Sequence, residues 1–77
     1  MANPNATELA SMLGCRFDFR QYFPAHEGPF VCDFKGTVVA VQVPHPGSGI
    51  EPALLVHQDG FPNPEYVDFE GLTFTPL

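Results

Sequence analysis

The spacing of the prolines constrains this chain more than any other feature. Nine of the 77 residues are proline, and all but Pro4 lie beyond residue 20. Proline lacks a backbone N–H group and clashes with the preceding helical turn, so it ends or breaks a helix. The intervals between the prolines are too short for long helices, and the sequence therefore predicts short extended segments joined by turns. These prolines are Pro24, Pro29, Pro44, Pro46, Pro52, Pro62, Pro64 and Pro76.

One short helix is predicted near the N-terminus, over about residues 6–13. Asn5 stands three residues before Glu8, which is the spacing of a capping box. Three apolar side chains then follow at helical spacing on one face. Gly14 stands where glycine commonly ends a helix. Residues 1–5 are expected to be flexible. The apolar positions are Leu9, Met12 and Leu13.

The run Thr37–Val43 is the clearest strand of the chain, because its valines and threonine favour a pleated sheet. A strand of this kind alternates between two faces. The alternation predicts one buried face, formed by Val39, Val41 and Val43. It predicts a second, more exposed or subunit-facing side, formed by Val38, Ala40 and Gln42.

Other extended segments flank this strand. The alternation of apolar and charged residues in 15–20 and 65–69 indicates half-buried strands. Further short strands are expected at 30–34, with a bend at Lys35-Gly36, and at 53–59 and 72–74. The apolar phase changes between Phe69 and Leu72, so a bulge or tight turn at Glu70-Gly71 must reset the register.

These elements predict a mainly β fold: a small antiparallel barrel or bent sheet of about five to six strands with one short N-terminal helix. The single domain spans residues 1–77. The order of 36–43, 53–59, 66–69, the reset at 70–71 and 72–74 resembles the small-barrel superfold that includes SH3-like and Sm-like domains. A helix before the barrel resembles the Sm-like variant best. In Sm-like proteins the resemblance implies RNA and neighbouring subunits as partners.

The charge balance limits the classes of partner. Nine acidic residues face three basic ones, giving a net charge of −6. Direct binding to nucleic acid is not expected, because Lys and Arg must replace the counterions at phosphates. A basic protein partner fits this charge better. No membrane span and no secretory signal are visible, so a cytoplasmic location is expected. Cys15 and Cys32 are then expected to be reduced, whereas in an exported protein they could form a disulfide.

No motif for catalysis, a cofactor or a metal is found. The run Gly47-Ser48-Gly49 lacks the lysine and following helix of a phosphate loop. The three histidines lack metal-ligand spacing, and two of them are expected in solvated loops and His57 on a strand face. No cofactor or metal is therefore expected. The histidines are His26, His45 and His57.

Seven residues are the candidates for contact with a partner. Three are aromatic residues beside prolines in expected loops, since aromatic anchors dominate interface energetics: Tyr22, Phe23 and Phe61. Three belong to an acidic strip expected on the outward side of one strand: Tyr66, Asp68 and Glu70. The last, His45, lies in the long loop between residues 43 and 52, because loops commonly carry binding residues.

The sequence therefore predicts a non-enzymatic, small acidic binding protein that acts through protein–protein contacts or self-association as a homo-oligomer. Such a protein suits the accessory genes of bacteria, phages or plasmids. One alternative is an oligomeric enzyme, because the chain resembles plasmid-type dihydrofolate reductases in length and strand content. Their pore strand has a Val-Gln-Ile-Tyr run, and the nearest match here, Val41-Gln42-Val43-Pro44, lacks the tyrosine. Another alternative is an inhibitor that mimics nucleic acid with its carboxylates.

Overall fold

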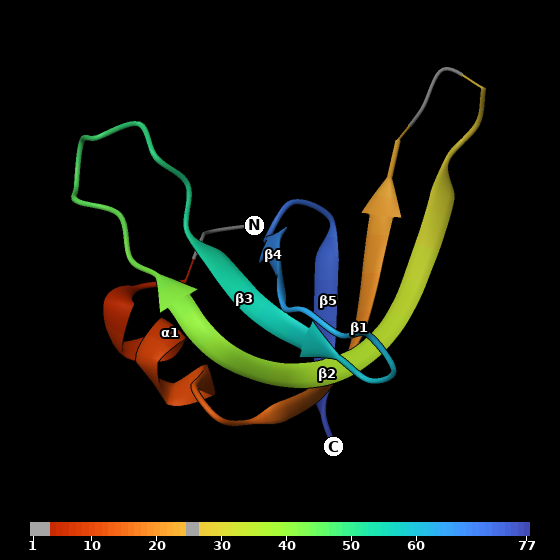
Figure 1. Ribbon diagram of the computed structural model, residues 1–77. Helices are drawn as coiled ribbons and strands as arrows, with labels where there is room; N and C mark the ends of the chain where they lie inside the picture. Colours follow the sequence, from red (N-terminus) through yellow and green to blue (C-terminus); the bar gives the residue numbers. More distant parts are fainter. Residues whose placement is uncertain (1–3, 25–26) are drawn as a thin grey trace.

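The computed structural model describes residues 4–24 and 27–77. Within them, one α-helix and five β-strands form (Figure 1). Their bounds are α1 Ala6–Met12, β1 Arg16–Phe23, β2 Phe30–Gln42, β3 Ala53–Gln58, β4 Glu65–Asp68 and β5 Leu72–Pro76. The prediction that residues 1–5 are flexible falls mainly on residues 1–3, which lie outside the described residues.

The five strands form one antiparallel sheet in the order β4-β3-β2-β1-β5. Strands β1 to β3 each pair with the next strand along the chain, and β5 returns to pair with β1. The sheet is bent but not closed, so β4 and β5 remain its edges (Figure 1). The mainly β prediction is therefore confirmed in its bent-sheet form, and a closed barrel does not form.

Helix α1 forms where it was predicted, but it ends at Met12, and Leu13, predicted on its apolar face, is 47% exposed. Asn5 accepts a hydrogen bond from the Glu8 N–H, and the Glu8 side chain accepts one from the Asn5 N–H, which completes the capping box. Gly14 follows the helix with a φ of 77°, a conformation that glycine adopts without strain. Leu9 and Met12 are buried and attach the helix to the sheet.

Strand β2 is longer than the sequence predicted. The segments 30–34 and 37–43 join into one strand of 13 residues without a break at Lys35-Gly36. Gly36 is instead needed for close packing. A Cβ atom there would lie 2.6 Å from the His57 carbonyl oxygen, so only glycine lets β3 approach at this point.

The predicted faces of Thr37–Val43 are wrong at Val38 and Val39 but right at Val41, and a β-bulge explains why. The register between β2 and β3 shifts between Val38 and Ala40, which leaves Val39 as the extra residue. Val38 is therefore fully buried, at 0% exposure, whereas Val39 is 47% exposed. The predicted alternation assumed an unbroken period of two along the strand, and the extra residue Val39 interrupts that period.

The core lies on the inner, concave side of the bent sheet. It consists of buried apolar side chains from α1 and all five strands: Leu9, Met12, Phe17, Phe19, Val38, Leu54, Val56, Val67 and Leu72. Burying each of these side chains contributes about 1.5–3 kcal/mol, which the ordering of the chain largely offsets. Within the described part of the chain, no helix is long and apolar enough to cross a membrane.

The predicted reset between β4 and β5 is confirmed. Val67 and Leu72 are both buried although one has an odd and the other an even number. Gly71 has a φ of 67° in the turn between them. Its carbonyl oxygen accepts a hydrogen bond of 2.9 Å from the Tyr22 N–H, so the turn is attached to β1 as well.

Candidate functional site

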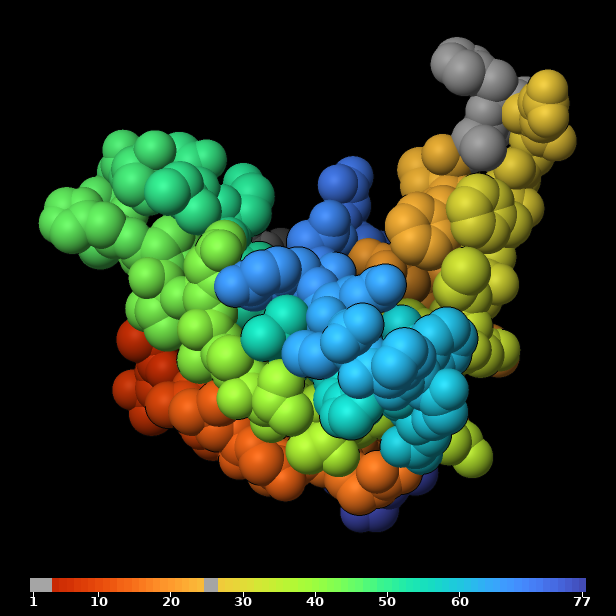
Figure 2. Space-filling model, in the orientation of Figure 1, coloured from red at the N-terminus to blue at the C-terminus, as the bar shows by residue number. Residues whose placement is uncertain are grey.

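The β1–β2 hairpin extends beyond both of its neighbours in the sheet. Strand β5 pairs with β1 only between Phe17 and Gln21, and β3 pairs with β2 only from Gly36 onward. The hairpin end, defined here as residues 22–23 and 30–31, is therefore two-stranded. In Figure 2 it projects at the upper right, in orange and yellow, away from the green loop that follows β2.

Apolar side chains gather on this hairpin end. Phe30 is 53% exposed and Val31 49%, and Tyr22 is exposed to a similar degree. Phe23 and Phe30 are cross-strand partners whose rings stack with centroids 4.9 Å apart. Large apolar side chains that stay in contact with water on an ordered element are typical of a contact surface.

Along residues 30–34, no strand of the described chain pairs with β2 on the side of β3. The Lys35 carbonyl oxygen accepts a hydrogen bond from the Asp59 N–H, so Lys35 faces the side of β3. The direction alternates along a strand. Val31 and Asp33 consequently turn their N–H and C=O groups to that side as well, where β3 has already ended. We call residues 30–35 on this side the free β2 edge.

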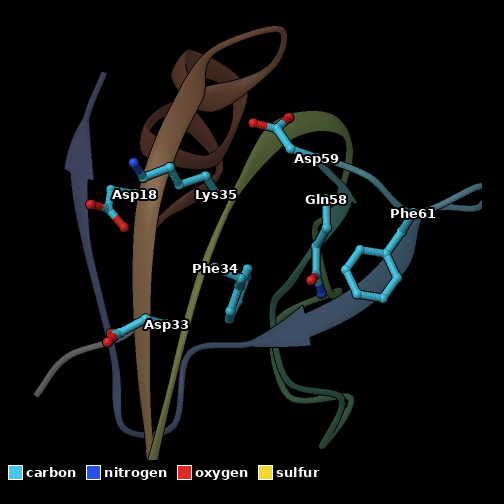
Figure 3. A pocket seen from close by; sticks show the side chains of 7 residues that line it. All are labelled: Asp18, Asp33, Phe34, Lys35, Gln58, Asp59 and Phe61. Atoms are coloured by element: carbon cyan, nitrogen blue, oxygen red, sulfur yellow. The ribbon is translucent and has the colours of Figure 1, made fainter.

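A hollow of about 440 Å³ lies where β3 ends beside the free β2 edge. In Figure 3, Phe34, Gln58 and Phe61 lie on the same side of β2, and the side chains of Gln58 and Phe61 are directed toward Phe34. The other four lining residues are charged: Asp18, Asp33, Lys35 and Asp59. The hollow therefore offers two aromatic rings and an amide to a side chain that enters beside β2.

The outer face of the hairpin bears charges that are paired within the chain. Arg20 donates two hydrogen bonds to Asp33, of 2.7 and 3.2 Å, and Arg16 donates two to Asp59, of 3.0 and 2.6 Å. The hydrogen bonds from these arginines, with their positive charge, hold the pKa of each aspartate below its usual value. The same hydrogen bonds raise the pKa of both arginines. Asp33 is thus a neutralised part of the outer face.

The seven predicted contact residues do not form one cluster. Tyr22 and Phe23 lie on the hairpin end, and Phe61 lines the adjacent hollow. Tyr66 is exposed on the edge strand β4. His45 lies in the loop between β2 and β3, with its Nδ1 atom 2.9 Å from the Pro46 carbonyl oxygen.

The predicted acidic strip takes a different form. Strand β4 ends at Asp68, and Glu70 lies in the following turn. The Gln21 side chain, only 8% exposed, donates to Asp68 Oδ1 at 3.0 Å and lies 3.3 and 3.2 Å from the carbonyl oxygens of Asp68 and Glu70. Asp68 Oδ1 also accepts from the Glu70 N–H. Asp68 therefore holds the β4–β5 turn against β1.

The loop between β2 and β3 borders a second hollow, of about 510 Å³, on the side of the α1 N-terminus. Val43, His45 and Ile50 contribute from the loop, and Pro4 and Leu9 from the other side. Gln42, from the run that resembles the reductase pore strand, donates a 2.7 Å hydrogen bond to the Glu51 carbonyl oxygen at the neck of this loop.

The cysteines and histidines are dispersed. Cys15 and Cys32 are free and exposed. Cys32 lies opposite Gln21, and Gln21 is six residues along the strand direction from Cys15. The two cysteines are therefore about 20 Å apart, which is too far for a disulfide within one chain. Among the described residues, no three His, Cys, Asp or Glu side chains gather to hold a metal ion. His57 Nε2 lies 2.8 Å from the Phe61 carbonyl oxygen, and His26 lies outside the described residues.

Sequence reasoning missed the free β2 edge and its residues Phe30, Val31 and Phe34. The sequence pattern showed that residues 30–34 are extended, but it did not show whether another strand pairs with them on the side of β3. The early break of β3 at Gly60 and Pro62 was a usable signal.

Comparison of the chain with models of protein families, with curated proteins and with solved structures finds no match.

Proposed function

We propose that this protein is a small protein-binding module whose contact surface is the free β2 edge together with the hairpin end. The observation that carries the proposal is the early end of β3, which leaves Val31 and Asp33 with outward backbone groups beside exposed Phe30. An extended segment of a partner would add to β2 as a further strand. In this mode the main-chain hydrogen bonds supply affinity and side-chain pockets supply specificity.

The side chains of the free β2 edge permit this addition. Natural edges are commonly protected by charged side chains that point inward or by prolines within the strand. Here Asp33 lies on the outer face, where it pairs with Arg20, and Pro29 precedes the strand. The inner face of the edge instead carries Phe30, Cys32 and Phe34, and it leads into the hollow at Phe61.

Where the added strand belongs to a different protein, the charge of the molecule favours a basic segment. Arg16 and Arg20, two of the three cations, are already paired with aspartates. Exposed Glu27 and Glu65 add to the negative surface. Such a surface raises the association rate with basic partners, and the gain falls as salt increases.

Val31→Pro tests the proposal, because it removes an outward N–H group and leaves the β1–β2 bonds intact. Proline is tolerated at edge positions whose N–H faces solvent. The matched control Val31→Ala keeps that N–H, and Tyr66→Ala removes an exposed aromatic ring elsewhere. Immobilised wild-type protein is used to capture partners from a host lysate, and circular dichroism checks that each variant folds.

We expect a protein captured by the wild type and by Tyr66→Ala to be retained in part by Val31→Ala and lost with Val31→Pro. Association of the protein with itself, lost with the same variant, supports the proposal equally. Capture that is the same for a folded Val31→Pro variant and the wild type would show that the free β2 edge is not the contact surface.

A further inference from the structure

We infer that the strand added to the free β2 edge is the same strand of a second copy, paired antiparallel about a two-fold axis at Cys32. The inference rests on the proposed function and names its partner. In this register Cys32 lies opposite Cys32, Val31 opposite Asp33, Phe30 opposite Phe34, and Pro29 opposite Lys35. The two sheets would then continue into one another with their inner faces on the same side.

The backbone of the free β2 edge fits this register at both ends. Val31 of each copy exchanges both backbone hydrogen bonds with Asp33 of the other, because these residues turn their N–H and C=O groups outward. The Lys35 N–H then meets the Pro29 carbonyl oxygen. Pro29 has no N–H to donate in return, and the Lys35 carbonyl oxygen already accepts from the Asp59 N–H. The N–H group that Pro29 lacks would therefore have faced the Lys35 carbonyl oxygen, which already has a hydrogen-bond donor in its own chain.

The aromatic side chains of the inner face also match. In each chain Phe19 stacks on Phe34 with ring centroids 5.0 Å apart, and Phe23 stacks on Phe30 at 4.9 Å. Pairing Phe30 of one copy with Phe34 of the other joins these two stacks into a continuous row across the interface. The Phe30 ring that enters meets the hollow of Phe34, Gln58 and Phe61 (Figure 3). Cross-strand aromatic pairs of this kind stabilise a sheet.

Two other registers fit less well. A two-fold axis at Asp33 places two carboxylates directly opposite each other, which is destabilising. A shift by one residue would bring residues whose backbone groups face β1 into the new ladder, so bonds could not form. The axis at Cys32 places Asp33 opposite apolar Val31, while each Asp33 stays paired with Arg20 of its own chain.

Sedimentation velocity over a range of concentrations tests whether the copies associate. One pair of strands is a small interface, so we expect a dissociation constant on the order of 10–100 µM. The sedimentation coefficient of wild type should rise from monomer to dimer across this range, and that of Val31→Pro should remain monomeric. Wild type that remains monomeric at about ten times this concentration would overturn the inference.

Cysteine cross-linking tests the register. Non-hydrogen-bonded partners in an antiparallel pair have Cα atoms about 4.5 Å apart, within the range of a disulfide. The Cys15→Ser variant keeps only Cys32, and the matched Cys32→Ser variant keeps only the equally exposed Cys15. The oxidant diamide takes up the two electrons and two protons released as each disulfide forms.

We expect the Cys32 thiol to give at least about tenfold more covalent dimer than the Cys15 thiol, because pairing raises its effective concentration. Adding Val31→Pro to Cys15→Ser should abolish that excess. Equal dimer yields from the two cysteines would refute the register. If the protein remains monomeric but still captures a lysate protein through a Val31-dependent contact, the second copy is wrong and the proposed function stands. If both fail, the proposed function falls as well.

Discussion

Replacing Gln21 should destabilise the protein far more than replacing another glutamine, Gln42, with the same side-chain change. The Gln21 amide is buried in the inner face of β1 and lies within 3.3 Å of three acceptor oxygens of the β4–β5 turn. The amide of Gln42, which is half-buried, donates one hydrogen bond of 2.7 Å to the neck of a loop. Gln21→Ala therefore removes the connection between β1 and the turn.

The magnitude follows from the groups that lose their partners. Each neutral hydrogen bond contributes about 1 kcal/mol, and a buried acceptor left without a donor costs about 1–3 kcal/mol. The one methylene group lost from the stem adds roughly 0.8 kcal/mol, while the freed rotamers return about 1 kcal/mol. Water that reaches the turn offsets part of the loss. We expect Gln21→Ala to lower the free energy of unfolding by about 2–3 kcal/mol, and Gln42→Ala by about 0.5–1 kcal/mol.

Urea unfolding followed by circular dichroism measures both values. A domain of this size has a total stability of only about 4–12 kcal/mol, so the loss at Gln21 should move the midpoint clearly. Gln21→Met keeps the length of the stem and should recover about 1 kcal/mol of the loss. If Gln21→Ala and Gln42→Ala have equal effects, the amide of Gln21 does not hold the turn, and the reasoning is wrong.

Three further predictions concern other parts of the fold. Gly71→Ala should cost more than about 2 kcal/mol in urea unfolding, because a methyl group there would overlap a carbonyl oxygen of β1 in addition to the strain of a positive φ. Gly14→Ala, with a similar φ and open space around it, should cost only about 1 kcal/mol, and equal costs would contradict the overlap. Leu9→Ala should lower the free energy of unfolding by about 2–4 kcal/mol, because it detaches α1 from the sheet. Helical circular dichroism should then be lost before global unfolding. An unchanged unfolding midpoint would show that the helix is not needed. The pKa values of Asp33 and Asp59 are lowered by hydrogen bonds from their arginine partners, so the folded state binds protons less readily than the unfolded state. Their contribution is therefore present above about pH 4 and is lost as the pH falls through the folded values. Asp33→Asn and Asp59→Asn should each flatten the decrease in the urea midpoint below about pH 4, and slopes equal to that of wild type would contradict the assignment.

Local features of the sequence predicted the elements of this fold well. The capping box at Asn5 and Glu8 sets the start of α1, because its geometry depends only on residues within one turn. The phase change between Val67 and Leu72 required a reset, and Gly71 was the residue able to adopt a positive φ there. In both places, residues adjacent in sequence decide the structure.

The bulge at Val39 shows where local reasoning ended. Nothing in a run of valines marks the extra residue, since Val38 and Val39 have the same propensity and size. The bulge is set by which residues of β3 lie opposite, and by the need to keep both Val38 and Val41 toward the core. That information depends on pairing between distant segments, so alternation within one strand could not supply it.

The same distinction applies to the candidate site. Periodicity assigns a side chain to a face of a sheet, but an edge is defined by the difference in length between two strands. Strand β2 has 13 residues, whereas β3 has 6, so part of β2 must lack a neighbour on that side. Aromatic residues beside prolines led to Tyr22, Phe23 and Phe61, which border the free β2 edge, although the argument for them concerned exposure alone. Exposed backbone, together with a row of phenylalanines that ends at this edge, is the reason we propose that a further strand is added here.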